Sequence, residues 1–150
     1  MSFVGIAVRV TGGAPYLRGV VLDDPNAGDQ DRFEFRPTAT EDLPTQILGI
    51  ADGLAGRLEV LTTPLTRVVL RLGDERQGHA KGPIQARTRT EGAVLYVARR
   101  FCVDVRALHG PDIGRACGTD RDGAEAQART LMGAADWVVA GSAALAAQSL

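Results

Sequence analysis

The chain has 150 residues, 45% of them hydrophobic and 23% charged, with 17 basic and 18 acidic side chains. That length suits one domain with a substantial core, and the hydrophobic share excludes a disordered chain. No apolar run approaches the roughly 18 residues of a membrane span, and the near-neutral charge excludes a uniformly basic nucleic-acid-binding coat. We therefore expect one cytoplasmic domain over residues 1–150, with no signal peptide and no membrane segment.

Three β-rich segments open the chain. Residues 3–10, 16–22 and 32–36 read as strands, and the Gly-Gly-Ala-Pro sequence within residues 11–15 is typical of a tight turn. Consecutive strands joined by short turns predict an antiparallel meander.

The middle of the chain alternates between helices and strands. Apolar residues at three- and four-residue steps predict a helix over residues 42–58, with Thr40 as its N-cap. Residues 67–72 form a nearly continuous apolar strand, as expected for a strand covered on both faces. A long basic helix over 84–101 and a fifth strand over 102–107 follow.

The C-terminal part of the chain is helical. We expect a short helical turn over residues 112–116, and then a helix capped by Asp120 or Asp122. Gly133 separates that helix from a last one over residues 136–147, whose small side chains suit close packing against a sheet.

Charge is unevenly distributed along this near-neutral chain. Residues 23–59 contain nine carboxylates and three arginines, whereas residues 76–106 contain seven basic residues and two carboxylates. The basic segment predicts a phosphate-facing surface, and its candidate nucleic-acid contacts are Arg87, Arg89, Arg99, Arg100 and Arg106. The alternative is a solvated helix face that pairs with the acidic segment of the same or a neighbouring subunit.

Cysteine and histidine residues form no metal-binding motif. The chain has only four, widely scattered: His79, Cys102, His109 and Cys117. Because a structural zinc site needs three or four converging ligands, we expect buried thiols and surface histidines, and no metal. Aromatic residues are also too few for a base-stacking platform, so Tyr96 and Trp137 are expected to pack inside.

The order of elements resembles the ribonuclease H-like fold, a mixed five-stranded sheet in which an antiparallel three-strand meander is followed by parallel strands and flanking helices. Residues 90–100 resemble the central helix of RuvC-type Holliday-junction resolvases. Residues 105–118 resemble the loop and turn that follow in that family. Residues 122–132 and 134–140 occupy the places of its last two helices.

The resemblance implies a catalytic site, but most of its carboxylates are replaced. RuvC-type nucleases hydrolyse phosphodiesters with two divalent ions held by four acidic residues. At the corresponding positions this chain has Ala7, Arg71, Gly133 and Asp136. One carboxylate does not hold two ions, and an inward-pointing Arg71 would repel them. We therefore do not expect the two-metal mechanism.

Other acidic residues offer a displaced site. Asp74 follows the fourth strand, where it could approach Asp136, and Glu91 lies on the long basic helix with its side chain turned inward. Together they could hold a single Mg²⁺ ion. The simpler roles are stabilisation of a helix N-terminus by Asp136 and a solvated loop at Asp74.

Three hypotheses follow. The leading one is a catalytically inactive RuvC/ribonuclease H-like domain, without a cofactor, that binds DNA, RNA or a protein partner. The second is a divalent-metal-dependent nuclease with the displaced site. The third is a structural protein that forms a homodimer, with acidic and basic segments facing each other.

Overall fold

The computed structural model describes residues 1–23, 30–74 and 81–150. His79, and the part of the basic segment that precedes Lys81, lie outside the described residues. The strands are β1 (Ser2–Thr11), β2 (Ala14–Leu22), β3 (Gln30–Phe35), β4 (Leu65–Arg71) and β5 (Val105–Leu108). The helices are α1 (Leu43–Glu59), α2 (Lys81–Phe101), α3 (Gly110–Ala116), α4 (Arg121–Met132), the 3₁₀ turn η1 (Ala135–Trp137) and α5 (Val138–Ser149).

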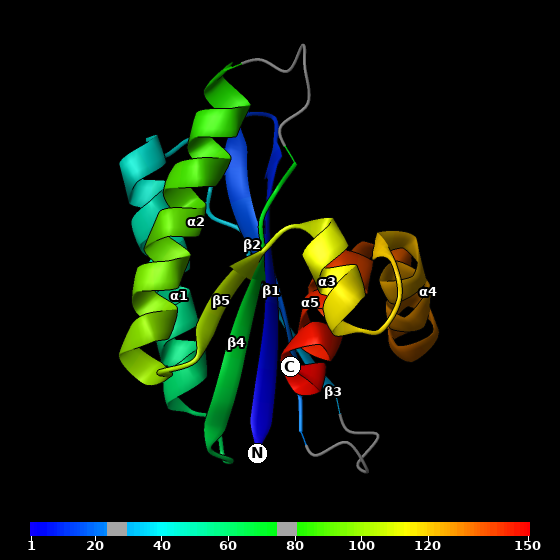
Figure 1. Cartoon of the computed structure of the whole chain (residues 1–150). Coiled ribbons are helices and arrows are strands. Elements are labelled where there is room, and N and C mark those ends of the chain that lie inside the picture. The colour runs from blue at the N-terminus through cyan, green and yellow to red at the C-terminus, as the bar shows by residue number, and fades with distance from the viewer. Residues whose placement is uncertain (24–29, 75–80) are drawn as a thin grey trace.

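The strands form one mixed sheet in the order β3-β2-β1-β4-β5. β1 pairs antiparallel with β2 and β2 with β3, whereas β1 and β4, and β4 and β5, are parallel. α1 and α2 cover one face of the sheet, and α3, α4 and α5 lie on the other (Figure 1). The expected five-stranded α/β fold, a meander followed by parallel strands, is confirmed.

Turns and caps account for most element boundaries. Gly12 and Gly13 both adopt positive φ in the β1–β2 hairpin, a conformation that glycine allows without steric cost. Gly133 ends α4 in the left-handed conformation, as expected. The Thr40 prediction is wrong, because the Asp42 side chain caps α1 by accepting from the Thr45 N–H at 2.8 Å.

Other boundaries differ from those expected by up to three residues, and the two largest differences are at the starts of α2 and β5. The long basic helix begins at Lys81, three residues earlier than expected, with Pro83 tolerated in its first turn. The last strand begins at Val105, because Cys102 is still tied to the end of α2 through its backbone N–H to Ala98.

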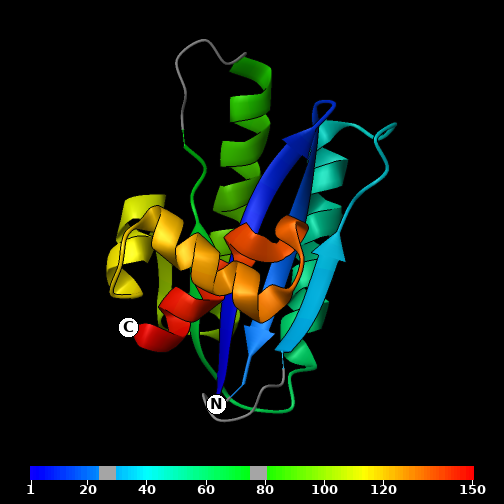
Figure 2. The ribbon, with the colours of Figure 1, turned by 90° about the vertical axis from the view of Figure 1, so that its right-hand side faces the viewer.

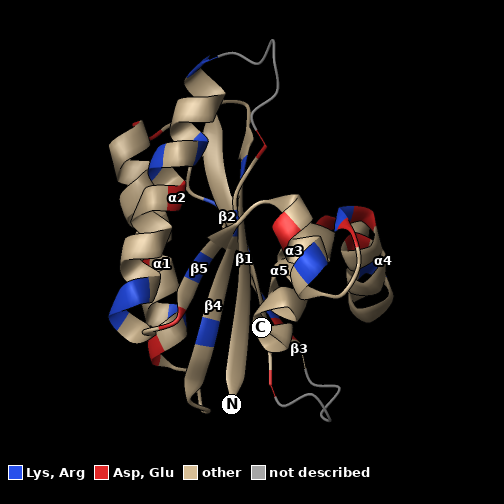
Figure 3. Ribbon diagram, in the orientation of Figure 1, with Lys and Arg blue, Asp and Glu red and all other residues tan. Residues whose placement is uncertain are grey.

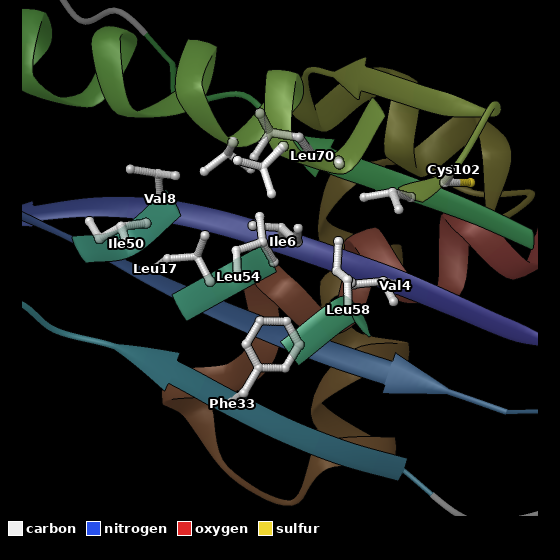
Figure 4. Packing of buried hydrophobic residues seen from close by; sticks show 14 of the residues in the cluster. Val4, Ile6, Val8, Leu17, Phe33, Ile50, Leu54, Leu58, Leu70 and Cys102 are labelled. Atoms are coloured by element: carbon white, nitrogen blue, oxygen red, sulfur yellow. The ribbon is translucent and has the colours of Figure 1, made fainter. Parts of the chain in front are cut away.

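One core lies between the sheet and the α1–α2 layer (Figure 4). Alternate residues of β1 point into it, and they meet side chains spaced three and four residues apart along α1. The labelled members are Val4, Ile6, Val8, Leu17, Phe33, Ile50, Leu54, Leu58, Leu70 and Cys102.

The other core is built on small residues. α5 packs against β1, β4 and β2, and six of its eight buried residues are alanine or glycine. At Gly5 on β1, an added Cβ would overlap the backbone of Ala144. The α5 backbone therefore lies directly on the strand, as the small-residue composition predicted.

In the described ranges, no helix is both long enough and apolar enough to cross a membrane.

Candidate functional site: an arginine-lined cleft at the strand ends

The site begins with two residues that the sheet places side by side. β1 and β4 are parallel, and their register pairs Ala7 with Arg71. Ala7 packs with residues of α5, so both side chains belong to the sheet face that carries α3, α4 and α5. The carboxyl-terminal half of β1 runs past those helices in the side view (Figure 2).

A cleft of about 510 Å³ occupies this end of the sheet. Its walls come from β1, the end of β4 and the residues after it, the first two turns of α2, the start of α4 and the start of α5. Its charged lining residues are Arg9, Arg71, Arg87, Arg121, Asp74 and Glu125. Four arginines against two carboxylates give the lining a positive formal charge, which suits an anionic ligand.

Arg71 lies deepest among these arginines. Its side chain is only 8% exposed, and its Nη1 donates to the Leu72 carbonyl oxygen at 2.7 Å. Both terminal nitrogens also reach Asp74, with Nη1 3.5 Å from Oδ1 and Nη2 3.3 Å from Oδ2. The cation that the sequence places where RuvC-type enzymes carry a carboxylate therefore does line the cleft.

Asp74 is surrounded by basic side chains. Beyond Arg71, the Arg121 Nη1 lies 3.9 Å from its Oδ2 and the His109 Nδ1 lies 3.9 Å from its Oδ1. The Arg71 guanidinium holds the pKa of Asp74 below its ordinary value, with smaller contributions from Arg121 and His109. Asp74 is thus an ionised carboxylate that already has cationic partners.

Glu91 is buried beside the same cleft, as its inward position on the helix predicted. Its Oε2 accepts from the backbone N–H of Gly73 at 3.0 Å, and its Oε1 lies 3.6 Å from the Arg87 Nε. Burial raises the pKa of Glu91, opposed by the Gly73 N–H and the Arg87 charge. These contacts tie the start of the segment after β4 to α2.

Asp136 lies elsewhere. It is exposed in η1, and its carbonyl oxygen accepts from the Arg18 Nη1 at 2.8 Å. It is absent from the residues that line the cleft. Asp74 and Glu91 are brought together, and Asp136 is not.

These residues do not fit a divalent metal ion. Within residues 1–23, 30–74 and 81–150, no three His, Cys, Asp or Glu side chains are grouped so that they could hold one. The Ala7 side chain has no ligand atom, and the neighbouring Arg71 carries a positive charge that opposes a cation.

The five candidate arginines do not form one surface. Arg87 lines the cleft, whereas Arg89, Arg99 and Arg100 are exposed on α2 away from it. Arg106 lies on β5 and pairs with Asp104 at 2.9 Å. Figure 3 shows that basic positions are spread over α2, the strands and the α3–α4 layer.

Three basic residues of the site were missed by the sequence reasoning. Arg9 is two residues beyond Ala7, so strand periodicity alone places both on one face. Arg121 and His109 gave no such signal, because they come from α4 and from the residue before α3. Only the tertiary fold brings them to Asp74.

Arginines and aromatic rings extend the basic region across the sheet from the cleft. Arg18 is the β2 partner of Ala7, and its guanidinium lies 5.2 Å from the Tyr16 ring centroid and 5.6 Å from that of Trp137. Arg36 stacks on Tyr16 at 3.9 Å. Trp137 is half-buried, in line with its expected packing, whereas the expectation for Tyr96 is wrong because it is 71% exposed.

The cysteines have no feature of reactive thiols. Cys102 is buried and Cys117 half-buried, both are free, and burial raises the pKa of each. A raised pKa disfavours the nucleophilic thiolate, which agrees with the expected structural role.

Comparison with known proteins gives a match in structure only. No family model matches the chain, and no curated protein matches it. The Thermus thermophilus RuvC structure is similar over 99% of this chain and 94% of that one, with a TM-score of 0.70 and 16% identity. T. thermophilus RuvC in complex with Holliday junction substrate is similar over 99% and 93%, with a TM-score of 0.71 and 14% identity. The chain therefore has a RuvC-like, ribonuclease H-like fold.

Proposed function

We propose that this protein is a nucleic-acid-binding domain that holds the phosphodiester backbone in its arginine-lined cleft and does not hydrolyse it by a two-metal mechanism. One observation carries the proposal. Arg71, buried and in register with Ala7, points into a cleft where the resemblance to RuvC-type nucleases calls for metal-binding carboxylates.

The chemistry of the lining favours phosphate. A guanidinium is always charged and presents paired donors that match two phosphate oxygens. Arg9 and Arg121 are exposed at the cleft, and Arg71 lies deeper than both. Arginines can therefore neutralise here the backbone charge that metal ions neutralise in a nuclease.

DNA is the ligand class to test first. A structural neighbour with this fold, T. thermophilus RuvC, has been solved in complex with Holliday junction substrate. Its similarity spans nearly the whole of both chains. RNA is the second ligand to test, since phosphate contacts alone do not distinguish the two.

The test is equilibrium binding to a four-way DNA junction, a linear duplex and an RNA hairpin, with EDTA present, over a series of salt concentrations. We expect the logarithm of the affinity to fall linearly with the logarithm of salt, with a slope of roughly one for each phosphate neutralised. The double variant Arg9→Ala/Arg121→Ala should weaken binding about tenfold or more and reduce the slope by about two.

The matched control is Arg115→Ala/Arg129→Ala, which removes two exposed arginines that do not line the cleft. It should change affinity much less. An equal loss in both variants would contradict the cleft as the binding site, and no binding at low salt would leave a protein partner as the ligand.

The same samples test the nuclease hypothesis. Junction DNA incubated with Mg²⁺ or Mn²⁺ should remain intact. Cleavage by the wild type that is abolished by Asp136→Asn would overturn this part of the proposal, whereas cleavage unchanged by Asp136→Asn would indicate a contaminating nuclease.

A further inference from the structure

Asp74 occupies the centre of the most strongly basic part of the cleft. Its two carboxylate oxygens lie 3.3 and 3.5 Å from the Arg71 nitrogens. The Arg121 Nη1 lies 3.9 Å from Oδ2, and the His109 Nδ1 lies 3.9 Å from Oδ1. Three basic side chains from three separate parts of the chain therefore converge on one anionic group.

Two glycines make room for this convergence. A Cβ at Gly110 would lie 2.7 Å from the Arg71 Nη2 and 2.6 Å from the Arg121 Cδ. A Cβ at Gly73 would overlap the guanidinium of Arg87. The space that side chains would take at these positions is filled by arginine, so the backbone itself is shaped around the basic cluster.

The Asp74 carboxylate makes only long contacts with this basic cluster. Charge-assisted hydrogen bonds between guanidinium and carboxylate are usually about 2.7–2.9 Å long, and all four contacts here are longer. A carboxylate has two oxygens in one plane, whereas a phosphate group has its oxygens arranged tetrahedrally. A phosphate at this point could contact Arg71, Arg121 and His109 at the same time.

We infer that Arg71, Arg121 and His109 form a seat for one phosphate group, and that the Asp74 carboxylate is an internal anion that fills the seat until phosphate displaces it. The Asp74 side chain is 37% exposed, so it can turn toward solvent without crossing the core. The inference rests on the proposed function for the source of the phosphate, the nucleic-acid backbone.

The consequence is that Asp74 weakens binding by competition. Neutralising it removes the carboxylate that the two arginines share, and with it a negative charge that repels phosphate. The substitution Asp74→Asn keeps the size of the side chain, and should raise the affinity for junction DNA about three- to tenfold and steepen the salt dependence by about one. Asp74→Ser, which removes the charge with a smaller side chain, should act in the same direction.

Asp112→Asn is the matched control. Asp112 also forms an ion pair with an arginine three residues away, Arg115, at 3.2 Å, and is similarly exposed, but it does not line the cleft. The same change in net charge is thus made outside the seat. Far-UV circular dichroism and a thermal melt establish that each variant is folded.

A second probe separates this inference from the proposed function. Inorganic phosphate is titrated into each variant at constant ionic strength, and the shift of the melting temperature is measured relative to chloride. Phosphate should raise the melting temperature of Asp74→Asn more than it raises that of the wild type or of Asp112→Asn.

The outcomes are distinct. DNA binding by the wild type without a gain in Asp74→Asn over Asp112→Asn overturns the seat and leaves the proposed function standing. A selective phosphate effect in Asp74→Asn without DNA binding by any variant supports the seat and contradicts the proposed function. A loss of affinity in both Asp74 variants would show that the carboxylate assists binding, contrary to the inference.

Discussion

At the scale of single residues, the strongest prediction concerns Glu91, because it is a carboxylate buried beside a cluster of arginines. Burial is the largest influence and raises its pKa, while the Gly73 N–H and Arg87 oppose the shift. A carboxyl group whose pKa is higher in the folded than in the unfolded state stabilises the fold relatively more at low pH. Its contribution is then lost as pH rises from the ordinary glutamate value through the raised one.

Glu91→Gln removes this titration and keeps an oxygen that can accept from the Gly73 N–H. We expect the free energy of unfolding of Glu91→Gln, relative to wild type, to increase as pH rises through that range. Urea denaturation at a series of pH values measures the difference. A difference that stays constant or decreases with pH would contradict the assignment of burial as the main influence on Glu91.

Sequence periodicity predicts the positions of some of these residues and not of others. The helical pattern placed Glu91 inward from local spacing, whereas Arg71 was assigned to the same site as Ala7 only through the resemblance to RuvC-type resolvases. The surroundings of Asp74 depend on Arg121 and His109, which lie 47 and 35 positions further along the chain. No local pattern encodes a contact over that separation, so the expectation of a solvated loop at Asp74 did not include these two basic partners.

The close packing of α5 on β1 is the main prediction at the scale of elements. Gly5→Ala would put a methyl group into the Ala144 backbone, which has no rotamer by which to move aside. We expect a loss of about 1–3 kcal/mol in the free energy of unfolding, typical of overpacking. Denaturant unfolding measures this loss.

Gly56→Ala is the control for that substitution. Gly56 is exposed within α1, and a Cβ there meets nothing within 4 Å. Because alanine favours a helix interior, this variant should gain up to about 1 kcal/mol. Equal effects of the two substitutions would mean that α5 does not lie on β1 as described.

The elements themselves were largely predictable, and their ends were less so. The alternation in β1 and the three- and four-residue spacing in α1 are strong local signals that identified both elements. The N-cap depended on whether Thr40 or Asp42 makes the hydrogen bond, a choice that spacing leaves open. β5 starts late because the Cys102 N–H still donates to the Ala98 carbonyl oxygen at the end of α2, and the chain pairs in register with β4 only from Val105.

At the scale of the whole molecule, the net charge of −1 does not show which charged side chains pair with one another and which line the cleft. Part of the acidic segment is neutralised within the chain, since Asp31 pairs with Arg57 and Glu34 with Arg18 and Arg36. The arginines of the cleft outnumber its carboxylates. A homodimer with acidic and basic segments facing each other stays a prediction, which light scattering at low and high salt tests.

The proposed function requires that the cleft arginines hold phosphate. NMR tests this most directly, by following the Nε–Hε signals of the arginine side chains during titration with a short DNA junction. The signals of Arg9, Arg71 and Arg121 should shift together and saturate, while those of Arg89, Arg99 and Arg100 on the outer face of α2 should stay in place. Shifts confined to the α2 arginines, with the cleft signals unchanged, would contradict the claim.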